Sequence, residues 1–306
     1  MSLITVGTMA FDAIETPFGK ANKIVGGSAM YAAYAASYFV KPVKQISIIG
    51  YDFPADELKA MEKRGIKMEG VEKVKNKKSF FWKGKYHEDM NSRDTLITDL
   101  NVLADFNPVL PPSYDGAEFV MLGNLMPKLQ MSVIDQLKKK PKLIVMDTMN
   151  FWMETAMDDL KKVLKRVDLL LVNDAEAREL THQYSLVKAA KKIMEMGPKY
   201  LIIKKGEHGA LLFYKTKVFF APAFPLEDVF DPTGAGDTFA GGFIGYLAKT
   251  NSISFENMKK AIIIGSAMAS FCVEKFGAAR LKELTKADIN TRLKQFKELT
   301  NFETTL

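Results

Sequence analysis

The sequence predicts an α/β fold in which helices cover both faces of a central, mostly parallel sheet. Short apolar runs typical of buried strands alternate with helical patterns along nearly all of the 306 residues. Polar residues stand where several of these runs end, which is the edge at which ligands bind in such sheets. Two polar, turn-rich stretches interrupt the alternation and predict a smaller β unit beside the main sheet.

The alternation is regular enough to place the individual elements. The runs that predict buried parallel strands are Leu3–Gly7, Gln45–Gly50, Phe119–Gly123, Leu143–Asp147, Leu169–Asn173 and Leu201–Lys205. The segments with helical periodicity lie near 28–39, 55–64, 129–139, 156–166, 175–182, 186–196, 237–249, 256–274 and 286–299. The sequence contains no internal repeat, low-complexity tract or linker.

Composition narrows the class of protein. The chain is 47% hydrophobic and 26% charged, which is typical of a soluble protein with a sizeable core. Its net charge of +7 comes from short scattered clusters rather than a basic stripe interleaved with aromatics, so nucleic-acid binding is not expected. The single cysteine, Cys272, excludes an internal disulfide, and no apolar run is long enough to span a membrane. We therefore expect a cytoplasmic protein with a small-molecule partner, because the first residues also lack a signal-peptide pattern.

The most informative segment is 231–244, which reads Asp-Pro-Thr-Gly-Ala-Gly-Asp-Thr-Phe-Ala-Gly-Gly-Phe-Ile. Small residues at a helix N-terminus let backbone N–H groups approach an anion, and the helix dipole favours negative charge there. Asp237 would stand beside that anion as a proton acceptor, an arrangement suited to phosphoryl transfer. A simpler interpretation is an ordinary loop with Asp237 as a helix cap. The glycines within the following helix weaken it, so close packing or ligand approach is expected to explain them.

Position for position, this segment resembles the C-terminal signature of the ribokinase-like (PfkB) carbohydrate kinase family. The resemblance extends over essentially the whole chain in length and order of elements. It implies a three-layer α/β/α fold and an ATP-dependent phosphotransferase acting on a hydroxymethyl group of a sugar or similar alcohol. Within it, Asp237 is the general base, while Gly234, Ala235 and Gly236 supply the N–H pocket for the transferred phosphoryl group.

The resemblance also assigns the nucleotide side. Asn173 and Glu176 match an Asn-x-x-Glu element that organises Mg²⁺ and phosphate through water, although the same residues could form an ordinary helix cap. Lys205, Gly206 and Gly209 match the loop beside ATP, where Lys205 could equally be solvated. The chain has no P-loop motif and only three histidines, which argues against a P-loop kinase and a structural zinc site.

On the acceptor side, Asp12 resembles the aspartate that accepts hydrogen bonds from acceptor hydroxyls, and Gly26-Gly27 resembles a Gly-Gly pair lining that site. The sequence departs from the family at Tyr31, where a sugar-contacting Asn is usual. A ring replaces an amide there, which puts ribose as the acceptor in doubt. Asp231 and Thr233 match a monovalent-cation site, which would bind K⁺, but Asp231 could also simply begin a turn.

The resemblance divides the chain into a main domain and a lid over the acceptor. The main domain would comprise 1–11, 26–78 and 104–306, and the lid would comprise 12–25 and 79–103, which could otherwise be surface hairpins. A lid excludes water that would compete as acceptor. Phe80, Phe81 and Trp82 could pair two lids in a homodimer, or the chain could be a monomer.

Several functions fit these features. A kinase for a sugar or polyol is the leading expectation, and a nucleoside kinase, whose base Tyr31 and the lid aromatics could sandwich, is the main alternative. A phosphosugar kinase would use Arg93 or Lys20 as a phosphate ligand. A catalytically silent sugar- or nucleotide-binding protein would have no need for Asp237.

Overall fold

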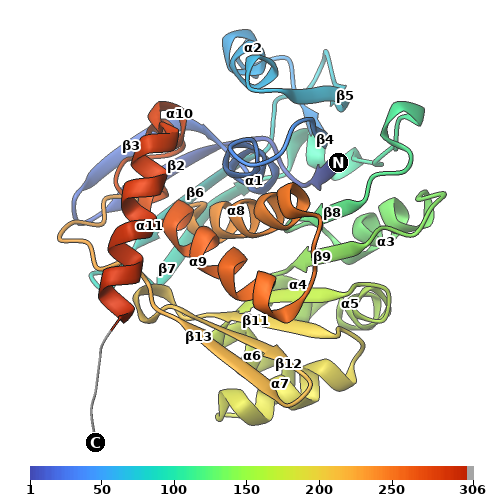
Figure 1. Ribbon diagram of the computed structural model, residues 1–306. Helices are drawn as coiled ribbons and strands as arrows, with labels where there is room; N and C mark the ends of the chain where they lie inside the picture. Colours follow the sequence, from blue (N-terminus) through green and yellow to red (C-terminus); the bar gives the residue numbers. More distant parts are fainter. Residues whose placement is uncertain (302–306) are drawn as a thin grey trace, which may run out of the picture.

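The computed structural model describes residues 1–301 and consists of a nine-stranded sheet with helices on both faces (Figure 1). The predicted fold class is therefore confirmed. The strands, in spatial order across the sheet, are β13 (Lys217–Ala221), β12 (Ala210–Tyr214), β11 (Tyr200–Lys204), β10 (Leu169–Asn173), β9 (Leu143–Asp147), β8 (Phe119–Leu122), β1 (Leu3–Val6), β4 (Val43–Ile49) and β5 (Ile66–Lys73). From β11 to β5 every neighbouring pair is parallel, whereas β12 and β13 are antiparallel.

The helices form two layers that cover the two faces of the sheet. One layer contains α1 (Ser28–Ala36), α2 (Ala55–Lys63), α8 (Ala235–Thr250), α9 (Phe255–Cys272), α10 (Ala279–Glu283) and α11 (Lys286–Thr300). The other contains α3 (Pro127–Asp135), α4 (Asn150–Thr155), α5 (Met157–Leu164), α6 (Asp174–Thr181) and α7 (Leu186–Glu195). Strand side chains alternate between these layers: Leu169 and Leu171 pack with the first, and Leu170 and Val172 with the second.

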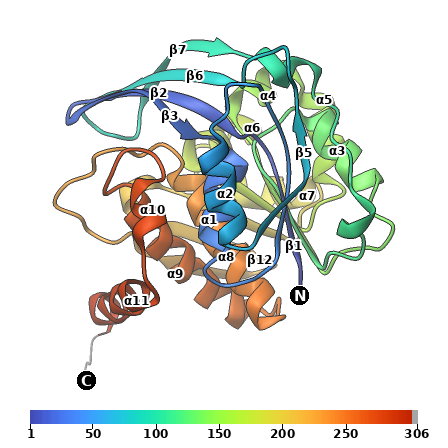
Figure 2. The same cartoon turned by 90° about the horizontal axis from the view of Figure 1, so that it is seen from above.

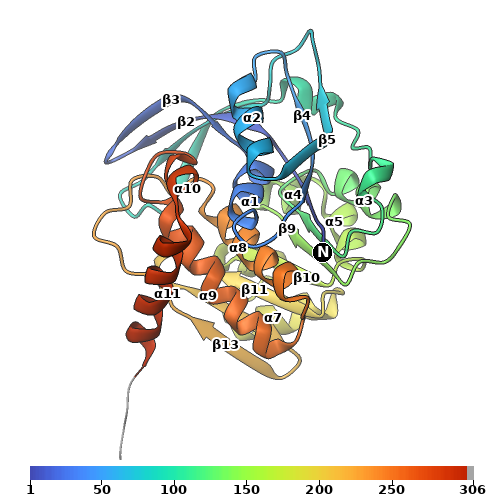
Figure 3. The same cartoon turned by 45° about the horizontal axis from the view of Figure 1, so that its top comes forward.

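The glycines of α8 explain how that helix fits between its neighbours. A Cβ at Gly241 would lie 2.2 Å from the Ala32 carbonyl oxygen of α1, and one at Gly245 would lie 2.8 Å from Ala36 Cα. On another side, a Cβ at Gly242 would lie 2.9 Å from the Met268 side chain of α9. Close packing against α1 and α9 therefore accounts for these residues, and Figure 3 shows α8 between the two helices.

A second, four-stranded sheet stands at one side of the molecule, separate from the main sheet (Figure 2). Its strands, in spatial order, are β3 (Gly19–Gly26), β2 (Ala10–Thr16), β6 (Phe81–Tyr86) and β7 (Arg93–Asp99). The strands β2 and β6 are parallel, while β3 and β7 pair antiparallel to them. Both turn-rich segments of the sequence contribute to this sheet, although β2 begins two residues before the expected boundary at residue 12.

The roles expected for this sheet remain predictions. Its edge strand β7 is exposed along its whole length, and Leu96 and Ile97 are among its exposed side chains. Pairing of two chains through this sheet and the division into two domains are not tested by the architecture. The last five residues of the expected main domain, 302–306, lie outside the described residues.

The differences from the predicted elements have local causes. β12 and β13 were not predicted because their turn has no glycine: Lys215 itself adopts a positive φ of 53°. β5 was missed because it is an edge strand with a half-exposed pattern, and α4 and α10 because they are short. α3 begins earlier than predicted, at Pro127, since proline suits a first helical turn. Within residues 1–301, no helix combines the length and apolar character that crossing a bilayer requires.

Candidate active site

The glycine-rich segment forms a tight loop that leads directly into α8, which begins at Ala235, two residues earlier than predicted. Gly234 precedes the helix with φ of 76°, a conformation that glycine adopts readily. Asp237 is the third residue of the helix and thus lies in its first turn. The N–H groups of a first turn have no acceptors within their own helix, so this loop can receive an anion.

Asp231 fixes the conformation of the loop through hydrogen bonds to backbone N–H groups. Its carboxylate is fully buried and accepts hydrogen bonds from the N–H groups of Thr233 (2.9 Å) and Gly277 (2.8 Å). Burial raises the pKa of Asp231, and the two N–H groups counteract that effect. The bond to Gly277 connects the loop to the segment between α9 and α10.

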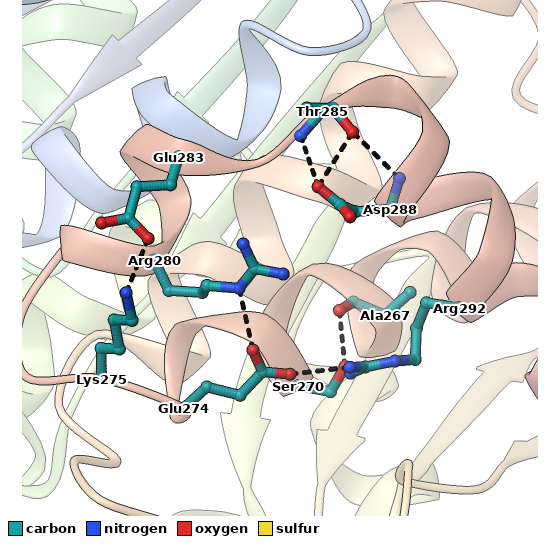
Figure 4. Close-up of polar contacts among 9 residues, drawn as sticks. All are labelled: Ala267, Ser270, Glu274, Lys275, Arg280, Glu283, Thr285, Asp288 and Arg292. Atoms are coloured by element: carbon teal, nitrogen blue, oxygen red, sulfur yellow. Dashed lines mark hydrogen bonds and ion pairs between the residues drawn. The ribbon is translucent and has the colours of Figure 1, made fainter.

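That segment is itself held by ion pairs with the C-terminal helices (Figure 4). Glu274 Oε2 accepts from Arg280 Nε at 2.9 Å, and Glu274 Oε1 accepts from Arg292 Nη2 of α11 at 2.7 Å. Lys275 and Glu283 form a further pair at 2.7 Å. The chain around Gly277 is therefore fixed against α9, α10 and α11, and Asp231 gains a rigid support.

Asp237 lies among charged residues from the strand ends. The pKa of Asp237 is raised to about 7, primarily by burial and next by the charge of Asp147, whereas Lys204 and Arg93 lower it. A carboxylate with such a pKa accepts a proton readily near neutral pH, which is what a general base requires. These charged neighbours come from β9, β11 and β7, so the geometry brings the two sheets together at Asp237.

Asn173 and Glu176 form a capping box at the start of α6. Asn173 Oδ1 accepts from the Glu176 N–H, and Glu176 Oε2 accepts from the Asn173 N–H, both at 2.7 Å. The helix-cap interpretation is therefore observed, and a role beside Mg²⁺ remains a prediction. Burial raises the pKa of Glu176 to about 7, while the nearby charge of Lys204 lowers it.

The acceptor side is built around Asp12 on β2. Its side chain is 5% exposed and lies so close to Gly26 that a Cβ there would be 1.9 Å from Asp12 Oδ2. Burial raises the pKa of Asp12 to about 7, with further increases from Asp231 and Asp237 and a decrease from the Gly27 N–H. Asp12 and Asp237 therefore lie near one another although they are far apart in sequence.

Tyr31 of α1 packs into the core next to this site. Its side chain is 1% exposed, and a Cβ at Gly234 would lie 2.5 Å from its ring. Among the described residues its buried hydroxyl has no hydrogen-bond partner. The ring thus fills the space between the Gly-Gly turn and the anion loop, rather than standing in the open as a stacking surface.

One face of the small sheet points toward these residues. Trp82 is in register with Asp12, and Arg93 is in register with Tyr86, so the members of each pair share a face. The hydroxyl of Tyr86 bonds to Thr233 Oγ1 of the anion loop at 3.1 Å. Arg93 is exposed, yet its charge lowers the pKa values of Asp237 and Glu176. Among the aromatic residues of β6, Trp82 shares its face of the sheet with Asp12, whereas Phe81 lies on the other face.

The predicted nucleotide loop follows β11. Gly206 and Gly209 both have positive φ: Gly206 begins a short 3-10 turn, Gly206–His208, and Gly209 directly follows it. A Cβ at Gly206 would lie 2.1 Å from Asn91 Oδ1, so the loop between β6 and β7 touches this turn. Lys205 is partly exposed. Lys20, a candidate phosphate ligand, is exposed and forms an ion pair with Glu15 at 3.1 Å.

Two residues that were not among the predicted site residues, Lys204 and Asp147, meet near the anion loop; the strand-end position of Asp147 was expected, but no role was assigned to it. Lys204 Nζ donates to both carboxylate oxygens of Asp147, at 3.1 and 3.2 Å. Alternation along the strands contained the necessary signal. Counting in steps of two from the buried Ile202 gives Lys204, and counting from Val145 gives Asp147, both on the face covered by α8.

The site contains several carboxylates that could take part in binding a metal ion. In residues 1–301, no three His, Cys, Asp or Glu side chains are grouped so that they could hold an ion by themselves. Carboxylate oxygens remain the ligand type that Mg²⁺ prefers, commonly together with water and substrate phosphates. Glu176 Oε1 takes no part in the capping box and is suited to such a water-mediated role.

Comparison with known proteins gives a consistent picture. The model of the pfkB family carbohydrate kinases matches residues 2–285. A cytidine kinase of Thermococcus kodakarensis is 29% identical over 283 residues, which cover 90% of this chain and 98% of that protein.

Solved structures share the fold. A nucleoside kinase of Methanocaldococcus jannaschii superposes with a TM-score of 0.76 at 21% identity, covering 96% of this chain and 99% of that one. A ribokinase of Thermotoga maritima gives a TM-score of 0.75 at 22% identity, with the same coverage of 96% and 99%.

Proposed function

Since the chain belongs to the pfkB family of carbohydrate kinases, and is thus a phosphotransferase with an alcohol group as acceptor, we propose that Asp237 is its general base and that the acceptor is a hydroxymethyl group of a small sugar or polyol. The observation that carries this proposal is the placement of Asp237 in the first turn of α8, directly after the anion loop and near enough to Asp12 for its charge to raise the pKa of Asp12.

The proposed reaction uses these residues in sequence. Asp12 accepts hydrogen bonds from acceptor hydroxyls and so orients the hydroxymethyl group toward Asp237. Asp237 takes the proton as the acceptor oxygen bonds to the γ-phosphorus of ATP, and the electron pair of the broken P–O bond leaves with ADP. The N–H groups of residues 234–236 stabilise charge that develops on the transferred group.

The remaining residues hold the nucleotide and exclude water. The Gly206 turn would contact ATP, while Asn173 and Glu176 would position Mg²⁺ through water. When bound, Mg²⁺ neutralises phosphate charge. Tyr86 of the small sheet bonds to Thr233 of the anion loop, and the charge of Arg93 lowers the pKa of Asp237, which supports a lid that closes over the acceptor.

A nucleoside is the second candidate acceptor. Trp82 shares a face with Asp12, so its ring could stack on a base while Asp12 binds the sugar hydroxyls. The cytidine kinase that matches nearly full length agrees with this choice. The buried Tyr31 takes no part in such stacking, which leaves Trp82 as the aromatic residue to test.

K⁺ binding at Asp231 and Thr233 is also part of the proposal. Asp231 is a buried carboxylate whose two oxygens each accept one backbone N–H, so each oxygen retains a lone pair for a cation. Such an ion would compensate the cost of burying this charge.

The test is ATP-dependent product formation on a panel of sugars, polyols and nucleosides, read by mass spectrometry. We expect one acceptor class to be phosphorylated by the wild type and turnover to fall by about 10³-fold or more in Asp237→Asn. Asp158→Asn, an exposed first-turn aspartate of α5, is the matched control and should leave turnover unchanged. Near-wild-type turnover by Asp237→Asn would overturn the assignment of the base.

A further inference from the structure

A largely buried ammonium group packs against the anion loop. Lys204 is the last residue of β11, and its side chain is 19% exposed. A Cβ at Gly236 would lie 3.0 Å from Lys204 Nζ, so the ammonium packs against the residue that precedes Asp237. This places a full positive charge at the loop whose N–H groups can receive an anion.

Asp147 fixes the position of that charge. Its two carboxylate oxygens accept from Lys204 Nζ at 3.1 and 3.2 Å, and only 7% of the Asp147 side chain is exposed. The ammonium has three N–H donors. Two bonds to Asp147 leave one donor, and among residues 1–301 no other hydrogen-bond acceptor of Lys204 occurs.

The surroundings keep Lys204 protonated. Burial alone would lower its pKa, but Asp147, Glu176 and Asp237 together hold the pKa above its usual value. A neutral amine is therefore not the species present near neutral pH. The residue can act as a fixed cation but not as a proton donor that changes state during the reaction.

We propose that Lys204 is a further catalytic residue, which binds an oxygen of the transferring phosphoryl group while Asp147 positions it. This inference rests on the proposed function. Lys204 would act from the main sheet, where its ammonium packs against Gly236 of the anion loop. Lys204 keeps its proton throughout, and the proton of the acceptor goes to Asp237. Such fixed charges stabilise a transition state without reorganising during the reaction.

A purely structural role is the alternative, in which Lys204 only neutralises the buried Asp147. Removing one partner of a buried ion pair leaves an unpaired charge and can itself prevent folding. The test therefore uses the double variant Lys204→Met/Asp147→Asn, which removes both charges, besides Lys204→Met and Lys204→Arg. Lys199→Met is the matched control. Lys199 pairs with Asp168 at the longer distance of 3.9 Å, and both residues directly precede β11 and β10, at the strand ends away from Lys204.

Nucleotide binding supplies the decisive measurement. Isothermal titration with AMP, ADP and a non-hydrolysable ATP analogue is performed without acceptor, and chemical unfolding establishes that each variant is folded. We expect the double variant to bind AMP like the wild type but the ATP analogue about 10-fold to 100-fold more weakly, and to lose about 10²-fold or more in kcat. Lys204→Arg should recover part of both, and Lys199→Met should change neither.

A folded double variant with wild-type affinity for the analogue and wild-type kcat overturns the proposal, because Lys204 then serves only Asp147. Equal weakening of AMP, ADP and the analogue also overturns it, since the contact would not involve the γ-phosphate. The binding results stand apart from the acceptor. A wild type that binds the analogue through Lys204 but phosphorylates no compound of the panel would refute the proposed function and not the binding role of Lys204.

Discussion

Replacing Asp237 by Asn should stabilise the protein while it abolishes turnover. The pKa of Asp237 is raised from 3.8 to about 7 in the folded chain, mainly by burial and by Asp147. A folded-state pKa above the unfolded one means that the protonated carboxyl favours folding. This contribution is complete below about pH 4 and is lost as the pH rises through about 7. Asparagine cannot ionise, so the variant keeps this stabilising contribution at every pH.

The magnitude follows from the shift. About three pKa units at about 1.4 kcal/mol each give up to about 4 kcal/mol at pH 8. At pH 5, where the unfolded carboxyl is ionised but the folded one is not, the difference is about 1.6 kcal/mol. Because part of the Asp237 side chain is exposed, both values are upper bounds.

Urea unfolding of the wild type and of Asp237→Asn at pH 5 and pH 8 measures this difference. The midpoint of the variant should exceed that of the wild type, and the gap should widen at the higher pH. The exposed Asp158→Asn supplies the control, whose midpoint should follow the wild type at both values. A variant less stable than the wild type at pH 8, or a gap independent of pH, would refute the argument that burial dominates the electrostatics at Asp237.

Three further outcomes are expected. The value of kcat/KM should rise with pH through about 7, because Asp237 must be ionised to accept the proton, and a profile flat from pH 5.5 to 8.5 would contradict that role. Trp82→Ala should lower kcat/KM about 10-fold for a nucleoside but little for a free sugar, and an equal loss for both would exclude stacking on a base. Turnover in K⁺ should exceed turnover in tetramethylammonium at equal ionic strength, and Asp231→Asn should remove the difference; equal initial rates would eliminate the cation site.

Much of the main sheet could be predicted because its strands are buried on both faces. Strands such as β9 and β10 read as continuous apolar runs, and their ends coincide with the predicted ones. For the small sheet, only the two contributing segments were predicted, and not the strands or their pairing. Its strands are half exposed, and its pairing joins residues far apart in the chain. Sequence periodicity does not specify partners at that separation.

The candidate site also contains a part that could be predicted from the sequence and a part that could not. The anion loop was predicted because its small residues and Asp237 are contiguous. Lys204 was overlooked in favour of the neighbouring Lys205, as the end of β11 was placed one residue too late. Tyr31 shows a limit of a different kind: its residue type indicated a stacking surface, but only packing against Gly234 reveals that the ring is enclosed.

The small sheet is assembled from two distant segments, and this affects the order in which it can form during synthesis. β2 pairs with β6 in parallel, with Phe11 opposite Phe81. At about 5–20 residues per second, roughly 4–14 s separate the synthesis of these partners on the ribosome. The hairpin of β2 and β3 is thus synthesised before β6, which completes the sheet. Until then its apolar residues Phe11 and Ile14 lack their contacts with β6. Nascent chains arrested shortly before residue 81 would therefore expose a hairpin edge that chaperones can recognise.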